Sequence, residues 1–377
     1  MVNRSTFTLV TARIASSRRL VRAYSAVVLT AAGCAVAAPA DPQRGPSAYE
    51  PISFSDVSVE EAVRLAADDI DRLDALRASE SEGAQALLER IRQVVEFVEK
   101  EEPDHASLDY LRGRLYAFIG RESEAMEHLQ RFVGTRAGRN EWRAYRVLGD
   151  LFVEHYPRLA RSHYESAAHL KSFEPTILAG LSRCARGTGD LNEAIRFAKD
   201  AAEADGDKTV FYAHNLARML MADNNWTEAQ GAAEMALNIA KRSAGQSQNP
   251  REWLGVVESQ YNLLIAILRR RVNETPGAAQ PYLDLVNYLR QRSQNSVAAA
   301  REDALSVLKR GIENTAPSTP APLLEQYAIA LSEAGRSEDA SKAFQDLRDR
   351  YPDNPAAAAW IGRAQSDEAA TDDQHKP

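Results

Sequence analysis

Small residues recur along this chain at a nearly constant interval. One series, separated by 35, 34 and 35 residues, comprises Ala125, Ala160, Ala194 and Ala229. A second series, separated by 36, 33 and 35 residues, comprises Gly113, Gly149, Ser182 and Ala217. Two antiparallel helices approach closely only where one presents a small side chain to a bulky residue of the other. The two registers therefore predict a repeated pair of antiparallel helices.

Bulky apolar residues and turn signals accompany these small residues. The bulky residues are Leu111, Leu115, Tyr116, Leu148, Phe152, Leu178, Leu181, Leu216 and Leu220. Gly120, Tyr156-Pro157 and Gly189-Asp190 stand where one helix must stop and the next begin. Alternating runs of β-branched residues are nearly absent, whereas Ala, Leu, Arg and Glu recur throughout. We expect an all-α fold with essentially no sheet, in which each repeat buries its apolar face against its neighbours.

The last unit, residues 321–354, reads APLLEQYAIALSEAGRSEDASKAFQDLRDRYPDN. Its Ala328, Gly335, Ala340, Phe344 and Pro352 fall on the set positions of the tetratricopeptide repeat (TPR) family, which this unit resembles. The resemblance extends over roughly residues 105–364. It implies a right-handed superhelical solenoid of antiparallel helix pairs, with a concave groove lined by the first helix of each pair. It also implies a function in binding proteins.

The middle of the chain departs from the regular period. Ala304 follows Ala229 by 75 residues, and one long helix is predicted over 251–272, between loops at 241–250 and 273–281. Residues 261–268, YNLLIAIL, are apolar on nearly every face of this helix, which a surface helix does not tolerate. Either the solenoid buries them, or a partner does so in a permanent complex.

The remaining segments complete the predicted organisation. The fold should begin at a capping box formed by Ser58 and Glu61. We expect a targeting segment (1–40), a Pro-containing linker (41–57), two capping helices (58–78 and 83–102, within 58–104), regular repeats (105–240), irregular helical repeats (241–315), a C-terminal TPR unit with a capping helix (316–364) and a disordered tail (365–377).

Residues 1–40 have the order of a secretory signal. Five arginines, with no Lys, Asp or Glu in this segment, precede an apolar stretch at 26–38 and small-x-small cleavage motifs at 35–37 and 38–40. The sequence Ala31-Ala32-Gly33-Cys34 resembles a bacterial lipoprotein box, although Ala31 stands where an aliphatic residue is usual, so Cys34 is a candidate for lipidation. Residues 17–22 weakly resemble a twin-arginine motif. We expect export to the periplasm or cell envelope.

A mitochondrial presequence is the alternative to export. The leader is rich in Arg, Ser and Thr and free of acidic residues, and Arg22-Ala23-Tyr24-Ser25 resembles a matrix-processing site. The leader has a compact Ala-rich apolar core followed directly by small-residue cleavage motifs. These features favour export, because a mitochondrial presequence does not need an apolar core with such motifs after it.

Charge and cysteine content narrow the classes of partner. The chain has 46 basic and 53 acidic residues, a net charge of −7, and loses five positive charges with the leader, which leaves −12. A general nucleic-acid binder needs a basic surface, so the expected partner is a protein or peptide, with the membrane contacted only through a lipid on Cys34. The two cysteines, Cys34 and Cys184, do not make a disulfide framework.

We expect no enzymatic activity, cofactor or metal, because no His-Glu-x-x-His helix, phosphate-binding Gly-rich loop or Gly-x-Ser-x-Gly elbow occurs. His155, His163 and His169 are spaced by eight and six residues, which does not suit a metal site on one helix face. Cys184 is predicted to be a small core residue. The acidic pairs at 68–69 and 101–102 are predicted to be solvated charge.

Arginines recur on the helices predicted to line the groove. The residues that directly follow the second series of small residues are Arg114, Asp150, Arg183 and Arg218, and Arg143, Arg146, Arg186, His214 and Asn215 lie on the same helices. Fork-shaped donors of this kind hold an acidic segment or a C-terminal carboxylate. In the alternative interpretation these arginines only pair with acidic residues of adjacent helices. The first interpretation predicts an exported scaffold or adaptor of the bacterial cell envelope, with a basic concave groove.

Overall fold

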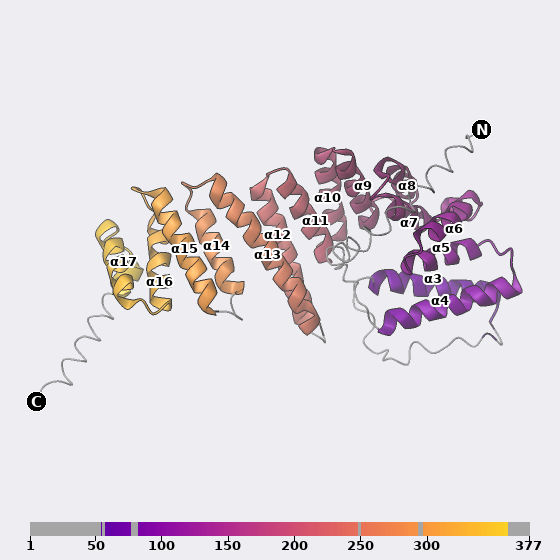
Figure 1. Cartoon of the computed structure of the whole chain (residues 1–377), viewed down its shortest axis with the longest axis horizontal. Helices are drawn as coiled ribbons and strands as arrows, with labels where there is room; N and C mark the ends of the chain where they lie inside the picture. Colours follow the sequence, from indigo (N-terminus) through magenta and orange to yellow (C-terminus); the bar gives the residue numbers. More distant parts are fainter. Residues whose placement is uncertain (1–53, 55–56, 77–81, 248–249, 293–296, 361–377) are drawn as a thin grey trace, which may run out of the picture. The chain divides into compact units, whose positions relative to one another are not determined.

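The computed structural model describes residues 54, 57–76, 82–247, 250–292 and 297–360. The leader with Cys34, most of the linker and the C-terminal tail lie outside them. Within the described residues every regular element is a helix, which confirms the all-α prediction (Figure 1). The chain divides into two compact units, residues 1–219 and 220–377.

Antiparallel helix pairs build the first unit. Its helices are α3 (Val59–Leu76), α4 (Glu82–Glu101), α5 (Leu108–Phe118), α6 (Glu122–Gly134), the short 3₁₀ turn η2 (Gly138–Asn140), α7 (Trp142–Phe152), α8 (Pro157–Leu170), α9 (Pro175–Thr188) and α10 (Leu191–Asp205). The boundary between the units falls inside α11 (Val210–Ala222). Ser58 Oγ accepts a hydrogen bond from the Glu61 amide at 3.2 Å, so the first helix begins at the predicted cap.

The predicted small residues lie at the helix contacts. Ala125, Ala160, Ala194, Ser182 and Ala217 are fully buried. Ser182 adds a hydrogen bond from its hydroxyl to the Ala194 carbonyl, 2.7 Å away, between the helices of the α9–α10 pair. At the end of α9, Gly189 has a φ of 86°, a left-handed conformation in which its amide donates to the Ala185 and Arg186 carbonyls and closes the helix.

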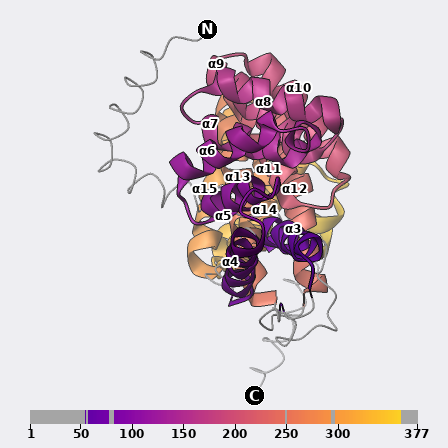
Figure 2. The same ribbon diagram turned by 90° about the vertical axis from the view of Figure 1, so that its right-hand side faces the viewer.

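The Tyr164 ring packs between two glycines of neighbouring helices. Tyr164 lies on α8, Gly149 on α7 and Gly180 on α9, and these three helices lie side by side in Figures 1 and 2. A Cβ added at Gly149 would stand 2.8 Å from the ring, and one added at Gly180 would overlap the ring atoms Cε1 and Cζ. The ring therefore requires glycine on both sides, and it joins two successive helix pairs.

The second unit contains α12 (Trp226–Gln246), α13 (Pro250–Glu274), α14 (Gln280–Arg292), α15 (Val297–Thr315), α16 (Ala321–Glu333) and α17 (Ser337–Arg350). The predicted loop at 241–250 is wrong in its first part, because α12 continues as helix to Gln246 alongside the long α13. The last pair has the expected packing, with Ala328, Ala340 and Phe344 buried and Gly335 at a φ of 76° in the turn.

The apolar core of the long helix α13 is buried by the chain itself. Leu264, Ile267 and Leu268 are fully buried, and Tyr261 and Ile265 nearly so. The chain thus covers the face that the permanent-complex alternative assigned to a partner. Near the start of α13, Leu254 remains 64% exposed. Among the described residues, no helix has the length and apolar character of a membrane span.

Replacing Gly180 by alanine tests the packing around Tyr164. We expect Gly180→Ala to lower the free energy of unfolding by about 1–3 kcal/mol, because its methyl group overlaps a ring enclosed on all sides. Denaturant titration followed by circular dichroism measures the change. Gly231→Ala on α12 is the control, since a Cβ there meets nothing within 4 Å and should raise stability by up to about 1 kcal/mol. Equal effects of the two substitutions would contradict this packing.

Candidate functional site

Four helices of the first unit, α3, α5, α7 and α9, are linked by a continuous set of ion pairs, here called the Asp–Arg ladder. Its members are Asp74 on α3, Arg114 on α5, Arg146 and Asp150 on α7, and Arg183 on α9. Asp74 Oδ2 accepts from Arg114 Nη2 at 2.7 Å and from Arg146 Nη2 at 2.8 Å. Arg146 Nη1 donates to Asp150 Oδ2 at 3.0 Å, and Arg183 Nη2 donates to Asp150 Oδ1. Each aspartate therefore bridges two guanidiniums.

Tyr164 ties the ladder to the glycine packing described above. Its hydroxyl donates to Asp150 Oδ1 at 2.7 Å and accepts from Arg183 Nη2 at 2.8 Å. Burial raises the pKa of this phenol well above its ordinary value, and the neighbouring Asp150 raises it further. The phenol thus remains a neutral donor, and the same side chain fills the space between two helix pairs and completes the hydrogen bonding of a carboxylate.

Arg114 is the most buried member of the ladder, with 1% of its side chain exposed. Burial opposes the charge of its guanidinium, but Tyr110 and Asp74 more than offset that effect, and its pKa lies above the ordinary value. The Arg114 guanidinium also lies over the Phe118 ring, 5.4 Å from the centroid. A cation placed in this way is part of the packed interior.

The predicted groove residues divide into two groups. Arg114, Arg146 and Arg183 belong to the ladder, and Arg143 pairs with Asp71 at 3.0 Å and with Glu141 at 3.6 Å. These four guanidiniums have carboxylate partners within the chain. Such pairing is what the alternative interpretation predicts, in which the arginines pair with acidic residues of adjacent helices. The remaining predicted residues are Arg186 and Arg218, which are exposed, and His214 and Asn215, which are half-buried.

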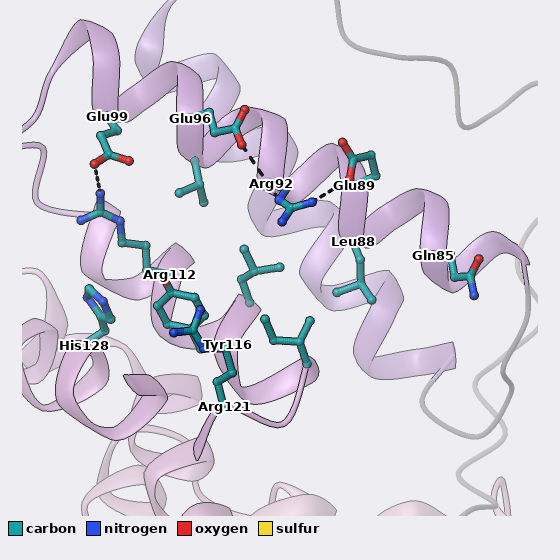
Figure 3. A pocket seen from close by; sticks show the side chains of 13 residues that line it. Gln85, Leu88, Glu89, Arg92, Glu96, Glu99, Arg112, Tyr116, Arg121 and His128 are labelled. Carbon is teal, nitrogen blue, oxygen red and sulfur yellow. Dashed lines mark ion pairs between the residues drawn. The ribbon is translucent and has the colours of Figure 1, made fainter. Parts of the chain in front are cut away.

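A cleft of the first unit lies between α4 and the following pair of helices, α5 and α6 (Figure 3). Its volume is about 550 Å³, within the range of about 300–1,000 Å³ typical of binding clefts. Its apolar surface comes from Leu88 and Val95 of α4, from Leu115 and Tyr116 of α5, and from Ile119, which directly follows α5 and is 49% exposed. The sequence patterns did not reveal this cleft, although an apolar residue directly before the Gly120 turn was a usable signal.

Ion pairs surround the apolar floor of the α4–α6 cleft. Along α4, Arg92 lies between Glu89 and Glu96, with N–O distances of 3.6 and 4.0 Å (Figure 3). Arg112 reaches from α5 to Glu99 of α4 at 2.5 Å. On the opposite wall the Arg121 guanidinium covers the Tyr116 ring, 4.8 Å from its centroid, and pairs with Glu124 at 2.6 Å. The lining itself includes three arginines and three glutamates, since Glu124 lies outside it, and all three arginines are already paired with carboxylates.

Other candidate chemistry has structural explanations. His163 stacks on Phe152 with 5.5 Å between ring centroids, and burial lowers its pKa. Cys184 is fully buried, and its burial raises the pKa of the thiol to about 11.

The prediction that Asp69 is solvated is wrong, because α4 brings Arg90 to within 3.1 Å of its carboxylate and covers it. Burial raises the pKa of this carboxyl. No group of metal-ligating side chains occurs within the described residues.

Solved structures similar to this chain are TPR proteins. MamA matches at 18% identity over 44% of this chain and 99% of its own, with a TM-score of 0.38. A thermophilic TPR protein of Thermus thermophilus matches at 16% identity over 53% and 99%, with a TM-score of 0.39. The APC/C hetero-tetramer Cut9–Hcn1 matches at 14% identity over 80% and 52%, with a TM-score of 0.41.

No family model matches the chain, and no curated protein matches it in sequence. The likeness to the solved structures concerns the fold alone. The description of the fold as TPR-like helix pairs therefore rests on the helix order, the spacing of the small residues and their burial.

Removing one shared carboxylate tests the Asp–Arg ladder. Asp74→Ala should lower the free energy of unfolding by about 2–4 kcal/mol, because it leaves Arg114 buried without its carboxylate, although Asp74 itself is partly exposed. Chemical denaturation measures the change. The control is Asp339→Ala, which removes the partner of Arg336 in an exposed pair and should change the free energy of unfolding much less, because water screens exposed pairs. A ladder without structural importance would make the two variants equally stable.

Proposed function

We propose that this protein is an exported scaffold or adaptor of the bacterial cell envelope that binds a protein partner through the α4–α6 cleft. The observation that carries the proposal is the apolar floor of the cleft, formed by Leu88, Leu115 and Ile119 on helices of a packed frame. Apolar anchors that enter preformed pockets supply most of the energy of protein interfaces.

The surroundings of the cleft suit a protein ligand better than a charged small molecule. Its rim consists of Arg and Glu side chains already paired with one another, so a charged ligand would have to break those pairs. An apolar side chain of a partner covers the floor and leaves the rim pairs intact. Tyr and Arg, here Tyr116 and Arg121, are also enriched at protein interfaces.

The basic concave groove is a second candidate surface on the same scaffold. An acidic segment that used Arg114 or Arg146 would have to displace the aspartates that already bind them. Breaking a buried pair is expensive, so such a ligand has only Arg186 and Arg218 as exposed cations among the predicted residues. The cleft needs no such displacement, and for that reason we favour it.

The location of the protein is proposed from its leader. A basic segment, an Ala-rich apolar core and small-x-small motifs in that order support export, with Cys34 as a candidate site of lipid attachment. The mitochondrial alternative predicts cleavage near Ser25 instead.

Fusing residues 1–40 to a signal-less alkaline phosphatase tests export, because this enzyme forms its disulfides and becomes active only outside the reducing cytoplasm. We expect activity in a bacterial host, and loss of activity when Leu29→Arg interrupts the apolar core. A Cys34→Ser fusion separates lipid attachment from export. An inactive wild-type fusion that isolated mitochondria import and cleave would instead support the presequence.

Affinity capture from the native host tests the cleft. An Ile119→Glu variant places a charge on the apolar floor and should lose the partner that the wild-type protein captures, by about tenfold or more in recovered amount. Leu254→Glu is the matched control, since it alters an even more exposed apolar residue in the other unit. An Arg186→Glu, Arg218→Glu variant tests the groove. A partner lost only from this last variant would contradict the cleft as the binding site.

A further inference from the structure

An apolar projection lies at the turn between α8 and α9. Phe173 is 81% exposed, and its φ of 59° places it in the left-handed region, which bulky residues rarely adopt. Leu170, at the end of α8, is 41% exposed. We call these two side chains the knob. Asp207 and Asn224 have a similar left-handed φ of 58° at other helix turns, so the exposed aromatic ring is what distinguishes the turn at Phe173.

Neighbouring contacts hold the turn that carries the knob. Lys171 Nζ lies 2.8 Å from Glu174 and 4.5 Å from the centroid of the Trp142 ring. The Lys171 amide donates to the Ala167 carbonyl at 2.9 Å, and Pro175 begins the next helix directly after Glu174. The Phe173 ring is therefore presented by an anchored turn, which lowers the entropy cost of inserting it into a partner.

The same unit carries both the knob and a hollow that could receive it. The knob belongs to α8 and α9, which pack against each other and against α7, whereas the cleft is built from α4, α5 and α6. Within one molecule, the knob and the cleft therefore lie on different sets of packed helices. An aromatic ring and an aliphatic side chain match the apolar surface of Leu88, Leu115 and Ile119 in chemical character.

Local charge permits contact between two copies of an acidic chain. The net charge of −7 makes copies repel one another in general. At the cleft, however, three arginines balance three glutamates, and beside the knob Lys171 is paired with Glu174. The named charges at both surfaces are already paired with opposite charges, which lowers the repulsion between two copies at this contact.

We propose that a second copy of this chain occupies the cleft, with Phe173 of one copy inserted between α4 and α5 of the next. This inference rests on the proposed function of the cleft as a protein-binding site. A contact between two different surfaces is head-to-tail, and it continues from copy to copy unless the rotation closes a ring. The self-association is reversible and heterologous, with the knob of one copy in the cleft of the next.

Sedimentation velocity over a range of concentrations tests the self-association. Wild-type protein should form species larger than the monomer as concentration rises, and Phe173→Ala should weaken the association about tenfold or more. Leu254→Ala, which removes another exposed apolar side chain, should leave it unchanged. A wild-type protein that stays monomeric throughout, or an equal loss in both variants, would overturn the proposal.

Cross-linking identifies the two surfaces. Ser172→Cys places a thiol beside the knob, Gln85→Cys places one at the cleft, and both are made with Cys34→Ser. Under mild oxidation a disulfide-linked heterodimer should form when the two variants are mixed. The control is Ser341→Cys on α17 of the second unit in place of Gln85→Cys, and equal cross-linking there would overturn the pairing.

The outcomes separate this inference from the proposed function. If Ile119→Glu loses a host partner while wild-type protein stays monomeric, the cleft binds a different protein, and the self-association is wrong. If wild-type protein associates and Phe173→Ala weakens the association but Ile119→Glu does not, the knob enters another surface and the self-association through the cleft is wrong, while affinity capture with Ile119→Glu still decides the proposed function.

Discussion

Tyr164 takes part in both the helix packing and the ion pairs of the first unit, through its ring and its phenolic oxygen respectively. The ring fits between α7 and α9 only because Gly149 and Gly180 leave room for it. Its hydroxyl then reaches Asp150, which binds Arg146 and Arg183. Displacing the ring would therefore disturb both the distance between the helix pairs and the positions of the charges along them.

The Asp–Arg ladder has consequences for recognition. Guanidiniums on first helices suggest a surface for acidic peptides, but Arg114 and Arg146 are buried and share Asp74 as their partner. In surroundings of low polarity, such pairs are costly to separate, and the carboxylates exclude competing anions. The ladder thus fixes the spacing of successive helix pairs, and binding of apolar groups is left to surfaces where hydrophobic side chains remain accessible.

The cleft and the knob result from irregularities in an otherwise regular array. Helix α4 leaves a gap beside α5 and α6 that its own side chains do not fill, and Ile119 remains half-exposed there. The turn after α8 holds Phe173 in solvent through a left-handed backbone. In repeat proteins most contacts of a unit are with its neighbours, so a departure at one unit changes the surface mainly at that unit.

The sequence by itself determined the helical class, the repeat period and the small residues at the helix contacts. Ala125, Ala160 and Ala194 were identified because close helix packing excludes larger side chains, and that requirement appears in local spacing. The helix break at Gly189 could also be predicted, since glycine adopts the left-handed conformation easily.

Only the tertiary structure decided which charged side chains pair. Asp74 lies 40 residues before Arg114 and 72 before Arg146, and no local pattern connects them. Asp150 interrupted a series of arginines in the sequence, yet it binds Arg183 of that series and also Arg146, one turn earlier on its own helix. Periodicity records what each helix presents to its neighbours, whereas the pairing of charges and the burial of a side chain depend on distances set by the packing of several helices together.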